Sequence, residues 1–372
     1  MKKLKYDTIL EINTKNLISN LNYFRSKLKP TTKIMAMVKA YGYGLGPTGV
    51  SKIMELQKVD YLGVANILEG VELRKAGISL PIMVMKPELE SFDLIIEYKL
   101  SPVIFSFHSL KALIKALDKY PKKFKSYLIN IKLDTGMHRL GFYPNEVLEL
   151  ISQLKKHPSI KIESVFSHLA ASDQVEHDNF THHQIKLFDE LFKEFEKSFD
   201  YKIEKHLLNS NGTLRFPEAQ YDMVRLGIGL YGFIADAEHD KYIKNVAILK
   251  AKIAQVKTIQ KSETVGYGRK GLAVKETKIA TIPIGYADGM SRLLGNGNWQ
   301  MKVNGKLAPT IGSVCMDMVM IDVSDVLCKE DDEVFVFYDK QSILKISELL
   351  QTIPYEILAT ISPRVKRIFT TK

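Results

Sequence analysis

Apolar and polar positions follow a regular alternation along the first two thirds of the chain. From residue 33 to about residue 230, short and nearly continuous apolar runs are each followed by an amphipathic stretch or a loop. Eight runs are predicted to be strands: residues 33–39, 61–65, 81–85, 102–105, 127–133, 160–166, 205–208 and 222–225. Buried strands that alternate with helices are typical of a parallel sheet covered on both faces. Eight such units indicate an α/β fold with a TIM-like (β/α)8 barrel, although the pattern alone fits an open sheet almost as well.

The pattern changes after about residue 240. Strand-like runs lie at residues 246–259, 278–284, 301–303, 318–323 and 333–338, and a short helical piece is predicted at 346–351. Glycine and asparagine turns separate these runs, and Asn304-Gly305 is a two-residue hairpin signal. We therefore expect a barrel domain over residues 10–238 and a mostly antiparallel β domain over residues 239–372. Residues 1–9 are a candidate addition to the β domain.

The composition is that of an ordinary globular protein. Of 372 residues, 45% are hydrophobic and 26% are charged, which excludes disorder over the whole chain. No apolar run approaches the roughly 20 residues of a membrane span, and the basic start has no apolar stretch behind it. Two cysteines, Cys315 and Cys328, are too few for a disulfide framework. We expect a cytoplasmic protein with no membrane partner.

The net charge of +11 calls for a test against nucleic-acid binding. A phosphate-binding surface needs clustered cations, whereas the lysines here are scattered through helical stretches together with glutamates. Nucleic acid is therefore not an expected partner. The histidine group at residues 177–183 has no acidic ligands at a suitable spacing, so no metal is expected either.

Polar side chains recur where the predicted strands end, which is where the functional residues of a (β/α)8 barrel lie. Lys39 closes the first strand, and a partly desolvated lysine has a lowered pKa that frees its amine for Schiff-base chemistry. A lysine that extends out to solvent is the alternative for this residue alone. Polar residues also end four later strands: Lys132, His168, Asn209-Ser210 and Arg225. Their agreement predicts a site at the carboxyl ends of the strands.

Several segments of the chain together resemble the alanine racemases, which are pyridoxal phosphate (PLP) enzymes of fold type III. The similar segments are VKAYGYGLG at 38–46, KLDTGMHRLG at 132–141, SHLAA at 167–171, NS at 209–210, VRLGIGLYG at 224–232, VGYG at 265–268, IGYADG at 284–289, GSVCMD at 312–317 and PYE at 354–356. They span nearly the whole chain in the family order. The resemblance implies an isomerase that interconverts L-alanine and D-alanine and supplies D-alanine for peptidoglycan. It also implies an N-terminal PLP-binding barrel, a β domain, and a homodimer with shared active sites.

The resemblance implies two catalytic residues. Lys39 would hold PLP covalently and act as the base on one face of the substrate Cα. Tyr267, from the other subunit's β domain, would act on the opposite face. Racemisation removes a proton from one face and returns one to the other, which two bases on opposite faces can do.

The resemblance also assigns residues to the cofactor. Arg225 would hydrogen-bond the pyridine nitrogen and, as an always-charged donor, keep that nitrogen unprotonated. The cofactor-binding residues implied are Lys39, Tyr43, His168, Asn209, Ser210, Arg225, Gly227, Ile228 and Tyr355. Of these, Tyr43, Ser210, Tyr355 and the amides of Gly227 and Ile228 would contact the phosphate.

For the substrate, the resemblance implies Arg139 and the Met316 amide as carboxylate contacts and Tyr286 as part of a narrow entrance. Lys132 would carry a carbamate that orients Arg139. Tyr41, Gly42 and Leu45 depart from the family's common loop sequence. The alternatives are a racemase of broader specificity, for serine, lysine or arginine, and a PLP-binding protein without catalytic activity.

Overall fold

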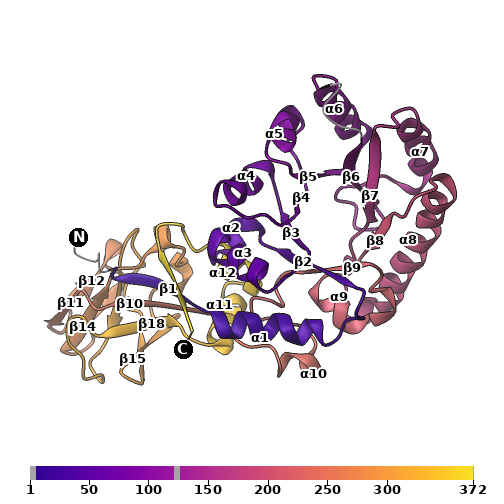
Figure 1. Cartoon of the computed structure of the whole chain (residues 1–372). Helices are drawn as coiled ribbons and strands as arrows, with labels where there is room; N and C mark the ends of the chain where they lie inside the picture. Colours follow the sequence, from indigo (N-terminus) through magenta and orange to yellow (C-terminus); the bar gives the residue numbers. More distant parts are fainter. Residues whose placement is uncertain (1–5, 121–125, 372) are drawn as a thin grey trace. The chain divides into compact units, whose positions relative to one another are not determined.

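The computed structural model describes residues 6–120 and 126–371, which form two compact units (Figure 1). The barrel unit comprises Ile18–Gly42 and Pro47–Ile243. The β unit comprises the described residues of Met1–Leu17, Tyr43–Gly46 and Lys244–Lys372. In the described part of the chain, no helix has the length and apolar character needed to cross a membrane.

Eight parallel strands close the barrel unit, as the apolar runs predict. They are β2 (Lys33–Met37), β3 (Tyr61–Val64), β4 (Ile82–Val84), β5 (Ser101–Ile104), β6 (Tyr127–Lys132), β7 (Ile160–Phe166), β8 (Glu204–His206) and β9 (Met223–Leu226). Closure rests on β2, which pairs in parallel with both β3 and β9. This double pairing decides between the two sheet types that the sequence left open, in favour of the barrel.

Helices follow the strands and surround them (Figure 1). The α-helices that lie wholly in the barrel unit are α3 (Pro47–Leu56), α4 (Ile67–Lys75), α5 (Phe92–Glu97), α6 (Phe107–Leu117), α7 (Val147–Lys155), α8 (Asp178–Ser198), α9 (Ser210–Arg215) and α10 (Ala237–Asp240). Helix α1 (Thr14–Arg25) begins at the end of the β-unit segment, and the short turn α2 (Lys39–Tyr43) follows β2. Asn66 begins α4 by accepting a hydrogen bond from the Glu69 amide at 3.0 Å, which fixes where Glu69 lies.

The β unit contains a six-stranded sheet in the order β16-β15-β18-β10-β1-β19. These strands are β16 (Lys306–Pro309), β15 (Gln300–Val303), β18 (Glu333–Phe337), β10 (Ala247–Lys252), β1 (Thr8–Asn13) and β19 (Lys366–Thr370). All pairs are antiparallel except β1 with β19. The mostly antiparallel character of this part of the chain is confirmed.

A smaller sheet and a hairpin complete the β unit. β11 (Gln255–Ile259), β14 (Thr277–Ile282) and β17 (Val319–Asp322) form a three-stranded sheet, and β12 (Thr264–Val265) pairs with β13 (Gly271–Leu272). Helices α11 (Lys340–Leu349) and α12 (Pro354–Ala359) lie near the end of the chain.

Three local features of the β unit bear on the sequence predictions. The hairpin at Asn304-Gly305 is confirmed: Val303 pairs with Lys306, and both turn residues have positive φ, 45° and 84°. The single run at 246–259 forms two strands in different sheets. The Ile253 amide still bonds to Asp332 O, beside β18, whereas the Ala254 amide bonds to Thr281 O of β14. The helix predicted at 346–351 is wrong in its bounds. It starts earlier, since Asp339 caps α11 through the Ser342 amide.

Candidate active site

The barrel unit gathers most of the predicted site residues at one face. Lys39 follows β2, Lys132 ends β6, His168 follows β7, Asn209-Ser210 follow β8, and Arg225 lies in β9. Because the strands are parallel and the barrel is closed, their carboxyl ends meet at a single rim. The geometry therefore fits one site rather than scattered structural residues.

The backbone at Lys39 has an unusual conformation. β2 ends at Met37, and the Val38 amide still donates to Gly63 O at 2.9 Å. After Lys39 the chain turns left-handed, with positive φ at Ala40, Tyr41, Gly42 and Tyr43 (52°, 56°, 63° and 52°). Left-handed helix costs an L-residue roughly 1–2 kcal/mol. Lys39 therefore belongs to a strained turn and not to the strand end itself.

The lysines of the site share a desolvated and cationic environment. Burial, and then the charge of Arg139, lower the pKa of Lys39, while the carboxylate of Glu69 acts in the opposite direction. Burial and Arg139 also lower the pKa of Lys132, to about 8. Both effects favour the neutral amine, which is the nucleophilic form.

Arg225 is buried and held rigidly by four acceptors. Its Nη2 donates to the carbonyl oxygens of Ser167 and Leu207, both at 2.7 Å, and shares one of its two hydrogens with His168 Nδ1 at 3.1 Å. Its Nη1 donates to His206 Nδ1 at 2.7 Å. Burial lowers the pKa of Arg225 to about 9, which still leaves the guanidinium charged at neutral pH. The site thus has a fixed cation at the end of β9.

A continuous chain of hydrogen bonds leads from Arg225 through the barrel interior. An arginine only donates, so His206 Nδ1 must accept, and the ring proton lies on Nε2. Nε2 therefore donates to Ser164 Oγ at 3.0 Å, and Ser164 donates to Asn130 Oδ1 at 2.6 Å. Burial, followed by the charge of Arg225, holds the pKa of His206 well below its usual value, in agreement with a neutral ring.

The same chain ends on a carboxylate. Asn130 Nδ2 donates to Ser101 Oγ at 2.7 Å, and Ser101 donates to Glu163 Oε2 at 3.0 Å. We call His206, Ser164, Asn130, Ser101 and Glu163 the polar chain. It orients Arg225, and none of its members was predicted. From the sequence alone, His206 is interpreted as a core residue. Its position at the end of a strand was the one sign that it could belong to the site.

Ser210 and the turn after β9 are joined by backbone hydrogen bonds. Ser210 Oγ accepts from the amides of Gly227 and Gly229, at 2.9 and 3.2 Å. The Gly227 amide, predicted as a direct phosphate contact, thus donates to Ser210 in this structure. Ile228 lies buried in the same turn, and Asn209 Oδ1 accepts from the Gly212 amide at 2.9 Å. The residues predicted for the phosphate in this unit are therefore adjacent.

Arg139 lies in a loop whose backbone is hydrogen-bonded to the carboxylate of Asp134. Asp134 Oδ1 accepts from the amides of Gly136 and His138, at 2.9 and 3.1 Å. Gly141 (φ 129°) closes the loop where an added Cβ would lie 2.6 Å from the Leu133 carbonyl carbon, so a side chain there cannot fit. Arg139 itself is exposed, in contrast to Arg225, and can reach a ligand that enters from solvent.

Tyr43 and Tyr355 lie together in the β unit, as their predicted shared role requires. Their ring centroids are 6.2 Å apart, and burial raises the pKa of the Tyr43 hydroxyl. Gly44 follows at φ 80°, where a Cβ would lie 1.8 Å from Leu358 O of α12. Arg367 donates twice to Gly44 O, at 2.9 and 2.8 Å, and fixes this segment.

The other predicted residues of the β unit gather around the loop at residues 313–318. Ser313 Oγ donates to Tyr267 O at 3.5 Å, and the Tyr286 amide donates to Cys315 O at 3.1 Å. Met316 lies in the loop itself. Tyr267 is 74% exposed, Met316 53% and Tyr286 43%. The three side chains therefore form an exposed group, which we call the loop cluster.

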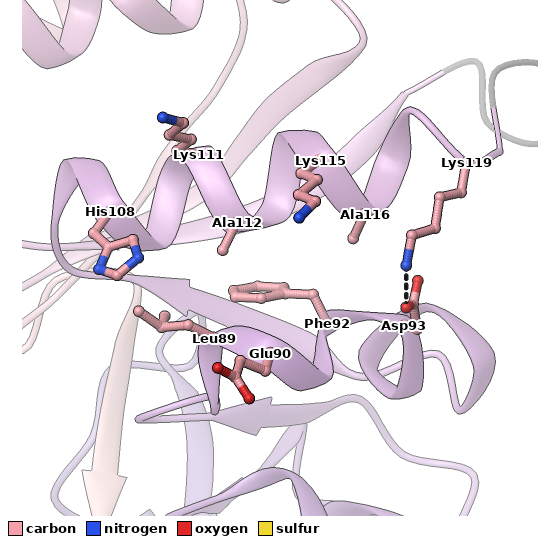
Figure 2. A pocket seen from close by; sticks show the side chains of 10 residues that line it. All are labelled: Leu89, Glu90, Phe92, Asp93, His108, Lys111, Ala112, Lys115, Ala116 and Lys119. Atoms are coloured by element: carbon pink, nitrogen blue, oxygen red, sulfur yellow. Dashed lines mark hydrogen bonds and ion pairs between the residues drawn. The ribbon is translucent and has the colours of Figure 1, made fainter.

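Other sites in the described residues are less suited to chemistry. A cavity of about 670 Å³ lies between α6 and the segment Leu89–Glu97 (Figure 2). Figure 2 shows Lys119 paired with Asp93 across it, while Lys111 and Lys115 are exposed. None of the predicted site residues lines this cavity. Within the described residues, no group of three or more histidine, cysteine or acidic side chains is placed to hold a metal.

A closed parallel barrel with two desolvated lysines and a buried arginine at one rim fits an enzyme of the (β/α)8 type that binds anionic ligands and uses amine chemistry. Models of the alanine racemase N-terminal domain and C-terminal domain match residues 12–234 and 246–369. The chain belongs to the alanine racemase family.

Individual relatives agree over almost the full length. The alanine racemase of Clostridium novyi (strain NT) is 36% identical, and the alignment covers 96% of this chain and 94% of the relative. The solved alanine racemase of Clostridium difficile 630 has a TM-score of 0.92 at 33% identity and covers 99% of this chain and 97% of that one. The structure from Bartonella henselae, with covalently bound pyridoxal phosphate, has a TM-score of 0.86 at 26% identity, covering 98% and 100%.

Proposed function

We propose that this protein is a PLP-dependent alanine racemase, an isomerase that interconverts L-alanine and D-alanine and supplies D-alanine for peptidoglycan. The observation that carries the proposal is the site at the barrel rim, where Lys39 has a lowered pKa and Arg225 is buried and fixed. Membership of the alanine racemase family supports the same reaction.

The side chains at the rim fit PLP. The cofactor has a phosphate, a phenolic oxygen and an aldehyde, and the rim supplies Arg139 and Arg225 as cations and Lys39 as an amine. The B. henselae relative holds pyridoxal phosphate covalently. We propose that Lys39 forms the covalent link and that Arg225 faces the pyridine nitrogen. His168, Asn209, Ser210, Gly227, Ile228, Tyr43 and Tyr355 are the remaining proposed cofactor contacts.

The chain's own residues move the protons. When bound, PLP withdraws electron density from the substrate Cα and acidifies its hydrogen. The neutral Lys39 amine takes or returns the proton on one face, and burial makes that neutral form accessible. The partner subunit's Tyr267 acts on the other face. Arg225 stays charged and donating, which limits how strongly the cofactor stabilises negative charge and so disfavours side reactions.

The exposure of the loop cluster supports a homodimer, which we propose as the active form. Tyr267, Tyr286 and Met316 have most or much of their side chains in solvent, as expected for groups that complete a site on another copy. We propose that Met316 and Arg139 bind the substrate carboxylate and that Tyr286 narrows the entrance. The proposed functional domains are residues 10–238 for PLP binding and 239–372 for the β domain, in a cytoplasmic protein.

Lys132 is proposed to carry a carbamate. Its pKa of about 8 leaves a useful fraction of neutral amine at cellular pH. That amine adds to the carbon of CO2 and loses one proton, which converts a cation into an anion. The new anion would pair with Arg139, whose charge already lowers the Lys132 pKa.

A chiral assay tests the function. Purified protein with PLP is incubated separately with L-alanine, L-serine, L-lysine and L-arginine, and the D-enantiomers are quantified. Fast conversion of alanine alone supports the proposal. Comparable conversion of the larger substrates indicates a broader racemase. PLP binding without any D-product indicates a binding protein and contradicts the proposal.

A further inference from the structure

The turn that carries Lys39 has an unfavourable backbone conformation. Four successive residues, Ala40 to Tyr43, have positive φ, and three of them have side chains. Within the turn, the Gly42 amide donates to Val38 O at 2.9 Å. A left-handed conformation is unfavourable for residues that have side chains, so a hydrogen bond from a neighbouring element adds to the stability of this turn.

Glu69 of α4 makes that contact. Its Oε1 accepts from the Ala40 amide at 2.7 Å, directly after Lys39. Its Oε2 accepts from the Ala65 amide at 2.7 Å, directly after β3. Hydrogen bonds to a carboxylate are about twice as strong as neutral ones. One side chain thus ties the segments that follow two adjacent barrel strands.

We propose that Glu69 is a positioning residue for Lys39: its carboxylate holds the amide that follows Lys39 and thereby fixes where the lysine amine lies. The proposal rests on the proposed function, since Lys39 is taken there as the reacting amine. It assigns to Glu69 a role that its place on an outer helix does not suggest.

The charge of Glu69 adds a second effect on the same amine. The charged groups that act on Lys39 are Arg139 after β6, Lys132 in β6, Arg225 in β9 and Glu69 in α4. Burial and the cations lower the Lys39 pKa, and Glu69 raises it. A group that must both accept and return a proton works best with a pKa near the working pH. Glu69 therefore limits how far the Lys39 pKa falls.

The variant Glu69→Gln tests both effects in the full-length protein. A glutamine has one acceptor oxygen, and its NH2 group would face the second amide as donor against donor. We expect hydrogen exchange at Ala40 or Ala65 to rise about tenfold or more in the PLP-free protein. With PLP, we expect kcat to fall about ten- to a hundredfold, while KM for alanine changes less than about threefold.

Trace acetylation of Lys39 against pH in the PLP-free protein, read by mass spectrometry, tests the charge effect of Glu69 separately from the hydrogen bonds. Loss of the Glu69 charge alone moves the midpoint to lower pH. Loosening of the turn would hydrate Lys39 and move its midpoint up towards the ordinary lysine value. A downward shift therefore supports the proposal, and an upward shift overturns the electrostatic part of it.

Glu72→Gln is the matched control, because Glu72 lies on the same helix and is exposed. If Glu69→Gln matches this control in exchange, acetylation and kcat, Glu69 does not position Lys39. If Glu69→Gln does not fold, Glu69→Asp is measured instead, since the shorter side chain cannot reach both amides. The exchange measurement needs neither PLP nor catalysis. A wild-type protein that fails to racemise alanine would overturn the proposed function without deciding this result.

Discussion

The predicted site residues of the two units differ in burial and in how many hydrogen bonds they make within the chain. In the barrel unit, Arg225 has four acceptors, and the polar chain continues from it to Glu163. In the β unit, Tyr267 is 74% exposed and shares the loop cluster with two other exposed side chains. The predicted site of the barrel unit therefore has Arg225 buried and hydrogen-bonded within the chain. The loop cluster has the solvent exposure expected of a surface that binds another molecule.

Lys39→Ala is expected to have the largest effect. Without the amine, no covalent link to PLP forms and one of the two proton-transfer groups is lost, so racemisation should fall on the order of 10⁴-fold. The purified variant should also be colourless after incubation with PLP and dialysis, as judged by its visible absorption. Circular dichroism should match the wild type. A variant that keeps its yellow colour would contradict the assignment of Lys39.

Tyr267→Phe tests the proposed catalytic role of the loop cluster. We expect exchange of the alanine Cα hydrogen with solvent to fall about 10²- to 10³-fold from one enantiomer and far less from the other. PLP binding, which depends on the barrel, should be unchanged. Tyr242→Phe, at an exposed tyrosine outside the proposed site, is the control. Equal losses from both enantiomers would show that Tyr267 is not a base on one face.

The desolvated amine of Lys132 should make the free energy of unfolding depend on pH. Its pKa is lowered to about 8 in the folded protein from an ordinary value of 10.5, so the folded state binds the proton less tightly than the unfolded state. Stability contributed by the neutral amine is fully present above pH 10.5 and is lost as the pH falls through 8. For the unmodified lysine, the difference is about 3 kcal/mol, since one pKa unit corresponds to about 1.4 kcal/mol.

Urea unfolding of PLP-free protein in CO2-free buffer measures this dependence. The wild type should gain stability between pH 8 and pH 10.5 relative to Lys132→Met, which removes the titrating group. If the two proteins gain stability in parallel, Lys132 is not desolvated in the folded state. A carbamate would appear separately, as a mass increase that is lost on acidification.

Asn130→Leu should have the smallest effect. It tests whether the polar chain stabilises the barrel unit. It leaves Ser101 and Ser164 of the polar chain without one partner each, which should cost about 1–3 kcal/mol of unfolding free energy. Thr181→Val is the control, because Thr181 Oγ1 is buried with no hydrogen-bond partner among the described residues. A smaller loss for Asn130→Leu than for Thr181→Val would contradict a cooperative chain.

The barrel was largely predictable from the sequence because its strands are buried on both faces and so read as apolar runs. Closure of the barrel could not be predicted, because it depends on the pairing of β2 with β9, which lie far apart along the chain. β1 and β19, each a single strand of mixed burial, gave too weak an alternation to be recognised.

The site shows a similar division. Lys39, Lys132 and Arg225 could be selected as candidates because these charged residues interrupt or directly follow apolar runs. Glu69 could not, because an acidic residue in the first turn of a helix is common for its interaction with the helix dipole alone. His206 could not either, since its significance depends on Arg225 and Ser164, which reach it only in the folded barrel.

The polar chain also has a consequence for how this family can change during evolution. Every hydrogen along it points one way, from the guanidinium to the Glu163 carboxylate. A substitution that turns one donor into an acceptor therefore faces a mismatched neighbour on each side, and only a matching second substitution restores the pattern. Positions 101, 130, 164 and 206 are thus expected to vary together among relatives, as one inherited unit, even though they come from four different strands.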